Sequence, residues 1–209
     1  MLGKAGSSST AISKAESVYG LLFWPLIAYS LMAALTVMTF KGKSDMLYKE
    51  NSFFVQHPAA MLVAFVAMAG NAALVKKVGG RDNTITHGTI MMAATLLAAY
   101  GFYVIYTNKV LKWGPGVTHF ASLHGKVGLA VMVGYIGLAV VGAVALHPVY
   151  GIYTRQQTWV RFAHKWGGRA VTALSWVCCI LGLQSMGKAF WIQAAFSIPL
   201  LFFGLFVLV

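Results

Sequence analysis

Six long apolar runs limit what this chain can fold into more than any other feature of its sequence. A helix needs roughly 20 apolar residues to cross the hydrocarbon core of a bilayer. We expect six membrane helices, over about residues 18–40, 53–75, 87–106, 124–146, 162–185 and 189–209. The runs are continuous and do not alternate with polar residues, which excludes a transmembrane β-barrel.

The polar segments between the runs are too short to fold as a separate domain. We therefore predict an all-α membrane protein in which residues 18–209 form one domain, preceded by a Ser-rich, disordered tail at residues 1–17. The first twenty residues contain no apolar stretch before a cleavage site, so we expect no cleaved signal peptide.

The charge balance narrows the class of partner. The chain has 16 Lys and Arg against 4 Asp and Glu, a net charge of +12. These basic residues lie in short groups between the apolar runs, where they contact lipid headgroups, so we expect a bilayer and a small anionic substrate but no nucleic acid. Nine lie near the N-terminal face and seven near the other, which favours cytoplasmic N- and C-termini.

Four histidines begin four successive helices. His57, His87, His124 and His164 lie at the N-terminal ends of the second to fifth runs. Successive helices run antiparallel, so His57 and His124 share the outer face, and His87 and His164 share the cytoplasmic face. Ionisable residues inside membrane spans are costly and usually functional.

Two facing histidines without carboxylates suit the two axial positions of a haem iron better than a zinc or di-iron site. Cys178 and Cys179 are adjacent in an apolar run, and no Cys-x-x-Cys-His motif is present, so the haem would be held non-covalently. His119 and His147 are expected to be interfacial side chains, although each lies near enough to replace a neighbouring ligand.

Glycines follow three of these histidines and would leave room for a porphyrin, although glycine is equally common at ordinary contacts between membrane helices. They are Gly88, Gly125, Gly128, Gly167 and Gly168.

Several motifs together resemble the eukaryotic cytochrome b561 family. They are His57-Pro-Ala-Ala-Met61 with Gly70-Asn-Ala-Ala-Leu-Val-Lys76, His87-Gly88, Ser122-Leu-His124 with Val127-Gly128, and Arg161-Phe-Ala-His164. The chain departs from the family at Asn71, where an acidic residue is common, and at Met91, where a second histidine is common.

This resemblance implies a four-helix bundle of the second to fifth helices around two haem b groups, with the histidine pairs given above. It implies a transmembrane ascorbate-dependent oxidoreductase that passes electrons from cytoplasmic ascorbate to a ferric chelate or monodehydroascorbate on the opposite face. The protein is then expected to be a homodimer in the plasma membrane or an endomembrane. Its ascorbate-binding lysines would fall on Lys76, Lys77 or Arg81, and its arginine on Arg155 or Arg161. On the outer face we expect His119 to contact the acceptor.

Other interpretations remain open. A quinol-linked cytochrome b also carries two haems, although it typically has two ligands on one helix, whereas each helix here offers one. A haem-free transporter needs polar groups or broken helices near the midplane. Anchoring to anionic lipid explains the basic residues as well as ascorbate binding does.

Overall fold

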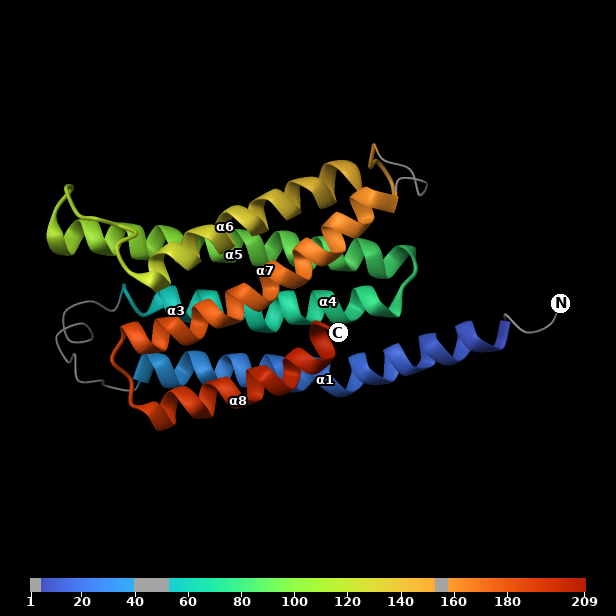
Figure 1. Ribbon diagram of the computed structural model, residues 1–209, viewed down its shortest axis with the longest axis horizontal. Coiled ribbons are helices and arrows are strands. Elements are labelled where there is room, and N and C mark those ends of the chain that lie inside the picture. The colour runs from blue at the N-terminus through green and yellow to red at the C-terminus, as the bar shows by residue number, and fades with distance from the viewer. Residues whose placement is uncertain (1–4, 40–52, 153–157) are drawn as a thin grey trace.

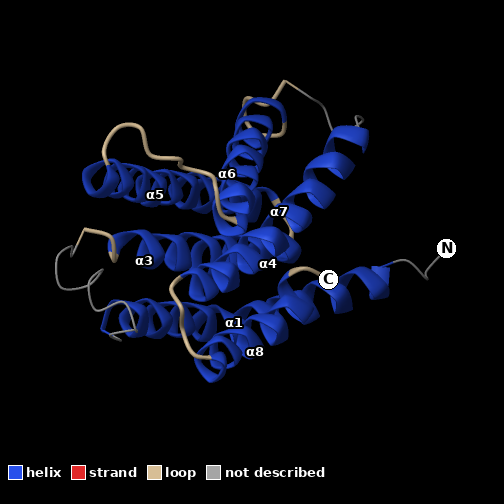
Figure 2. Ribbon diagram, turned by 60° about the vertical axis from the view of Figure 1, so that its left-hand side comes forward, coloured by secondary structure: helices blue, strands red, loops and turns tan. Residues whose placement is uncertain are grey.

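A computed structural model describes residues 5–39, 53–152 and 158–209 of the chain. Within these ranges every regular element is helical (Figure 2). Six helices are long and apolar enough to cross a membrane, over Glu16–Val37, Gln56–Val78, Arg81–Trp113, Leu123–Ala145, Thr158–Ser185 and Phe190–Val207. The predicted class, an all-α protein with six membrane spans, is confirmed.

The helical elements follow the chain in order (Figure 1). They are α1 (Ala5–Thr39), α3 (Gln56–Leu62), the π-helix η1 (Val63–Met68), α4 (Ala69–Val78), α5 (Arg81–Trp113), α6 (Leu123–Val140), the π-helix η2 (Val141–Ala145), α7 (Thr158–Ser185) and α8 (Phe190–Val207). α3, η1 and α4 together form the second span, and α6 with η2 forms the fourth.

Two helices differ most from their expected ranges. α1 already begins at Ala5, so the predicted disordered tail is wrong for residues 5–17. Extending a helix needs no new nucleus, and Ala11, Lys14 and Glu16 are residues that favour helix. The third span is longer at both ends, because its apolar core continues into polar helical turns that end at Gly80 and Gly114, both with positive φ.

The second span is the centre of the packing. α1 lies on one side of it and α5 on the other, with α8 beside α1 (Figure 1, Figure 2). α5 also contacts α6, α6 packs along α7, and α7 returns to α3 and η1. In the apolar 18-residue stretch of the second span 67% of the residues are buried, a larger share than in the corresponding stretch of any other described span.

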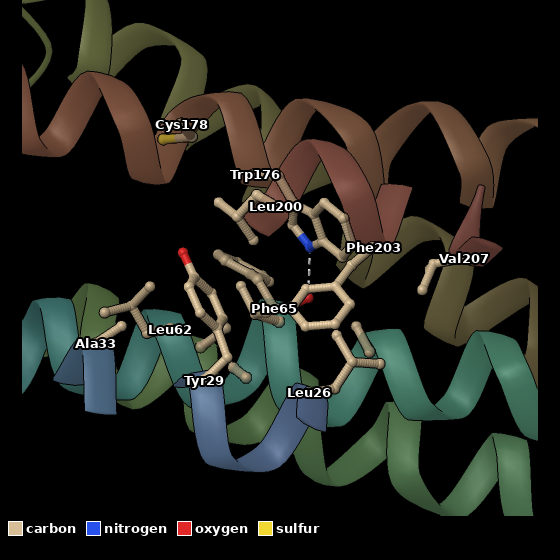
Figure 3. Packing of buried hydrophobic residues seen from close by; sticks show 14 of the residues in the cluster. Leu26, Tyr29, Ala33, Leu62, Phe65, Trp176, Cys178, Leu200, Phe203 and Val207 are labelled. Carbon is tan, nitrogen blue, oxygen red and sulfur yellow. Dashed lines mark hydrogen bonds between the residues drawn. The ribbon is translucent and has the colours of Figure 1, made fainter. Parts of the chain in front are cut away.

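A cluster of large apolar side chains fixes η1 against its neighbours (Figure 3). The indole N–H of Trp176 in α7 donates to the carbonyl oxygen of Phe65 in η1 at 2.9 Å. In a π-helix each backbone N–H bonds to the carbonyl oxygen five residues earlier, which interrupts the regular hydrogen bonding of the α-helix. Leu26 and Tyr29 of α1 and Phe203 of α8 close the cluster.

Large apolar side chains also cover the outside of the helices. Leu96 of α5 is 65% exposed and Leu201 of α8 is 69% exposed. Extensive apolar surface of this kind marks contact with a membrane. The chain is therefore an integral, multi-pass membrane protein.

Candidate functional site: two facing histidine pairs

One pair of imidazole rings lies where α3 and α6 begin. The ring centroids of His57 and His124 are 6.2 Å apart and the ring planes are 76° from parallel. α6 begins here because the Ser122 hydroxyl caps it, accepting a hydrogen bond from the Gly125 N–H at 3.1 Å. This cap places His124 in the first turn of the helix.

A second pair lies toward the opposite end of the bundle, near the starts of α5 and α7. The ring centroids of His87 in α5 and His164 in α7 are 6.5 Å apart, with ring planes 82° from parallel. The second span ends at Val78 and only Gly79 and Gly80, both with positive φ, separate it from α5. This tight turn brings His87 back beside α4.

Both spacings match two imidazoles on opposite sides of one metal ion. A metal–nitrogen bond of about 2.0 Å and a ring centre about 1.1 Å behind the nitrogen place two such centroids roughly 6.2 Å apart. The observed 6.2 and 6.5 Å agree with this separation. The spacing of each pair would therefore allow its two histidines to hold one metal ion between them.

In three of the four histidines, a hydrogen bond at Nδ1 leaves Nε2 available to bind a metal. Nδ1 of His57 lies 2.8 Å from the Gly101 carbonyl oxygen, and Nδ1 of His87 lies 2.8 Å from that of Ala72. Nδ1 of His124 lies 3.1 Å from the Cys178 carbonyl oxygen. A carbonyl can only accept, so each Nδ1 carries the proton and Nε2 offers its lone pair to a metal.

His164 differs from the other three. Its Nδ1 is buried and has no hydrogen-bond partner among the described residues. In the described part of the chain no carbonyl therefore selects its tautomer.

His119 and His147 make other contacts. The His119 ring stacks on the Tyr106 ring, with centroids 3.9 Å apart and planes 5° from parallel. The His147 ring stacks on the Tyr150 ring, with centroids 3.7 Å apart and planes 13° from parallel. His147 Nδ1 also accepts a hydrogen bond from the Val149 N–H at 3.3 Å. In the described part of the chain, no three His, Cys, Asp or Glu side chains come together as a metal-binding group.

Each histidine pair borders a cavity. The His57–His124 cavity has a volume of about 270 Å³ and is lined also by Lys109, His119 and Phe120. The His87–His164 cavity is larger, about 960 Å³. Phe65 lines the first cavity and Tyr135 the second. The centroids of these two rings are 4.9 Å apart, so one aromatic pair separates the cavities.

Five basic side chains line the His87–His164 cavity, and among the described residues no Asp or Glu does. They are Lys76, Lys77, Arg161, Lys165 and Arg169. Positive charge concentrated around a cavity raises the local concentration of anions. This cavity therefore suits a small anionic ligand.

Only some of the predicted ascorbate-binding residues line this cavity. Lys76, Lys77 and Arg161 line the cavity, whereas Arg81 does not, and Arg155 lies outside the described residues. The Lys76 ammonium donates to the Thr84 hydroxyl at 2.6 Å. Arg81 is the first residue of α5 and is exposed, because the turn at Gly79 and Gly80 directs it away.

Lys165 and Arg169 also line this cavity, although they are not among the residues predicted from the sequence. Both belong to α7, and with Arg161 they follow a spacing of four residues. Residues four apart share one face of a helix. That spacing was the signal, and it points all three side chains toward the same cavity.

Six membrane spans and two facing histidine pairs define a membrane protein with two candidate metal centres. The chain belongs to the eukaryotic cytochrome b561 family, whose family model matches residues 56–189. The matched region begins beside His57 and includes all four paired histidines. Membership in this family implies a haem b cofactor, and the donor set of each pair fits that group.

Curated relatives share a name that states an activity. The chain is 27% identical to the pig (Sus scrofa) protein named transmembrane ascorbate-dependent reductase CYB561, over 76% of this chain and 65% of that protein. It is 28% identical to the mouse (Mus musculus) protein of the same name, over 76% and 66%. The human (Homo sapiens) counterpart is 25% identical over 76% and 65%. The match thus spans about two thirds of these relatives' length.

Proposed function

We propose that this protein transfers electrons across a membrane, from ascorbate at the His87–His164 cavity to an acceptor at the His57–His124 cavity. Two non-covalent haem b groups would be held by His57 with His124 and by His87 with His164. The observation that carries the proposal is the repetition of one spacing between paired imidazole rings, 6.2 and 6.5 Å between centroids, toward opposite ends of the bundle.

The groups around each histidine pair would help to hold a haem. When bound, a haem with two histidine ligands supplies one-electron chemistry, because it has no open coordination position. The carbonyl oxygens of Gly101, Ala72 and Cys178 fix the tautomers of three ligands and raise their basicity. Phe65 lines one cavity and Tyr135 the other, and their rings contact each other between the two sites.

The basic cavity supports ascorbate as the electron donor. Ascorbate is a monoanion at neutral pH, and the cavity carries five cationic side chains. We assign Lys76, Lys77 and Arg161 to its binding, with Lys165 and Arg169 as further contacts. The name shared by the pig, mouse and human relatives supports the same donor.

The acceptor at the other cavity would be a ferric chelate or monodehydroascorbate. Lys109 supplies positive charge there and donates from its ammonium group to the His119 carbonyl oxygen at 2.7 Å. This contact holds the segment before α6 over the cavity. His119 would meet the acceptor with its ring, which is stacked on Tyr106.

We assign the His87–His164 cavity to the cytoplasmic face. The start of α1 and the end of α8 both lie toward the turn between α4 and α5 (Figure 1). The basic residues near the span ends favour that face as cytoplasmic under the positive-inside rule. A homodimer in the plasma membrane or an endomembrane completes the proposal.

Reconstituted vesicles test the proposal directly. Purified holoprotein is placed in vesicles that contain ascorbate, and ferric chelate or monodehydroascorbate is added outside. We expect reduction of an external acceptor that depends on both the protein and the internal ascorbate. Haem-loaded protein that reduces neither acceptor would refute the proposal. Faster reduction of the haems by a quinol would favour a quinol-linked cytochrome b, and protein without a Soret band would favour a transporter.

A further inference from the structure

The fourth and fifth spans share one spacing between a histidine and a glycine. Gly142 lies 18 residues after His124, and Gly182 lies 18 residues after His164. At 3.6 residues a turn, 18 residues make about five turns, so the histidine and the glycine of one helix face the same side, about 27 Å apart. Two antiparallel helices that meet along this side bring each histidine opposite the partner's glycine.

The packing of α6 and η2 against α7 has this reciprocal arrangement. A methyl group on Gly182 would lie 3.3 Å from Cε1 and 3.6 Å from Nδ1 of His124. A methyl group on Gly142 would lie 3.3 Å from Cε1 and 3.9 Å from Nε2 of His164. At both sites the nearest heavy atom is an imidazole carbon, and 3.3 Å is tighter than an ordinary contact.

The glycines expected from the sequence to make room for a porphyrin have no such contact. Nothing lies within 4 Å of a methyl group on Gly88 or Gly168, and those on Gly128 and Gly167 would meet Cys178 and Leu138. Gly125 meets its own helix cap. Contact with a histidine ring is therefore specific to Gly142 and Gly182 among these glycines.

We propose that Gly142 and Gly182 are positioning residues, each of which sets the ring orientation of the histidine opposite it and thereby the properties of one haem. The inference rests on the proposed function, because it concerns the histidines as haem ligands. Gly182 acts on the His57–His124 centre through His124. Gly142 acts on the His87–His164 centre through His164.

The two centres should respond differently to added bulk. The hydrogen bond of His124 Nδ1 to the Cys178 carbonyl oxygen restrains its ring, so a methyl group at Gly182 must strain that bond. His164 has no such bond among the described residues, so its ring rotates more freely when Gly142 gains a methyl group. Ligand orientation and hydrogen bonding both tune a haem's potential.

Alanine substitution at both sites tests the proposal, with a matched control on each helix. Gly182→Ala is compared with Gly167→Ala in α7, and Gly142→Ala with Gly137→Ala in α6. A methyl group at Gly167 makes an ordinary contact with Leu138 at 3.4 Å, one at Gly137 meets nothing within 4 Å, and neither glycine lines a cavity. The readouts are the two midpoint potentials from a redox titration of the holoprotein and the low-spin EPR signals of the oxidised haems, neither of which is a measure of catalytic activity.

We expect Gly182→Ala and Gly142→Ala to shift the potential and EPR signal of different haems, while the controls shift neither. A threefold change in the equilibrium constant for reducing one haem corresponds to about 28 mV for a one-electron couple. The proposal is refuted if both variants shift the same haem, if neither shifts one, or if the controls shift as much.

For a variant that accumulates poorly, the ratio of bound haem to purified protein is measured and tests the proposal. Loss of one haem with the other haem's signal intact supports the proposal. Loss of both haems from a variant whose control keeps two contradicts it, because the glycine would then act through the fold. Wild-type protein without haem would instead refute the proposed function, so the two failures are distinguishable.

Discussion

Replacing Gly134 by alanine tests how the packing of α6 on α7 supports both histidine pairs. A methyl group at Gly134 would lie 2.7 Å from Cγ2 and 3.2 Å from Cγ1 of Val171. Ordinary contacts begin at 3.4 Å, so the helices must separate by about 0.7 Å unless the valine moves. Valine in a helix strongly prefers one χ1 rotamer, so rotation gives little relief.

The expected cost of Gly134→Ala follows from this overlap. Over-packing of a well-packed contact costs roughly 1 to 3 kcal/mol. For a chain of this size, each kcal/mol lowers the melting temperature by about 2 to 4 °C, so we expect a decrease of about 2 to 12 °C. The temperature at which half of the monodisperse protein is lost, measured by size-exclusion chromatography in one detergent, reports this change.

A double mutant and a control make the test specific. Val171→Ala removes both methyl groups that meet the new side chain, so Gly134→Ala with Val171→Ala should cost about 0.5 to 3 kcal/mol less than the sum of the two single changes. Gly137→Ala, one turn further along α6, meets nothing within 4 Å and should leave the melting temperature unchanged or slightly higher. Wild-type stability for Gly134→Ala, or no relief in the double mutant, would refute the packing argument.

Three further substitutions test the site. Lys76→Gln should raise the KM for ascorbate several-fold without loss of haem, and more strongly at low ionic strength, where the Debye length is longer. Arg81→Gln, outside the cavity lining, should leave KM unchanged. Equal increases in KM for the two variants would show that the cavity does not bind the donor. Ser122→Ala should lower stability by about 1 kcal/mol through loss of the α6 cap, whereas Ser122→Asp should retain it; equal melting temperatures would contradict that role. Alanine at His119 or His147 should leave two haems per chain in a pyridine haemochrome assay, because both rings stack on tyrosines; loss of a haem would overturn the ligand assignment.

The number of spans and the face on which each histidine lies follow from local features of the chain. Apolar runs of about 20 residues determine the spans, and antiparallel succession then places His57 with His124 and His87 with His164. Their rings do lie 6.2 and 6.5 Å apart. Their role as haem ligands stays a prediction.

Membership of the cavity lining was harder to predict, as Arg81 and Arg169 illustrate. Both are basic and lie near the same end of the bundle. Arg81 follows the turn at Gly79 and Gly80 and is exposed. Arg169 lies two turns after Arg161 on α7 and lines the cavity. Charge alone does not distinguish them, because the direction of a side chain depends on the rotation of its helix.

The sequence by itself determined the membrane class, the six spans and the depth of each histidine, because helix length and period are local properties of the chain. Only the tertiary structure decided which carbonyl oxygens fix the imidazole tautomers, which basic residues surround the larger cavity, and that Gly142 and Gly182 face His164 and His124. These contacts join different helices. They depend on how each helix is rotated and tilted against its neighbour, which the packing of the whole bundle sets.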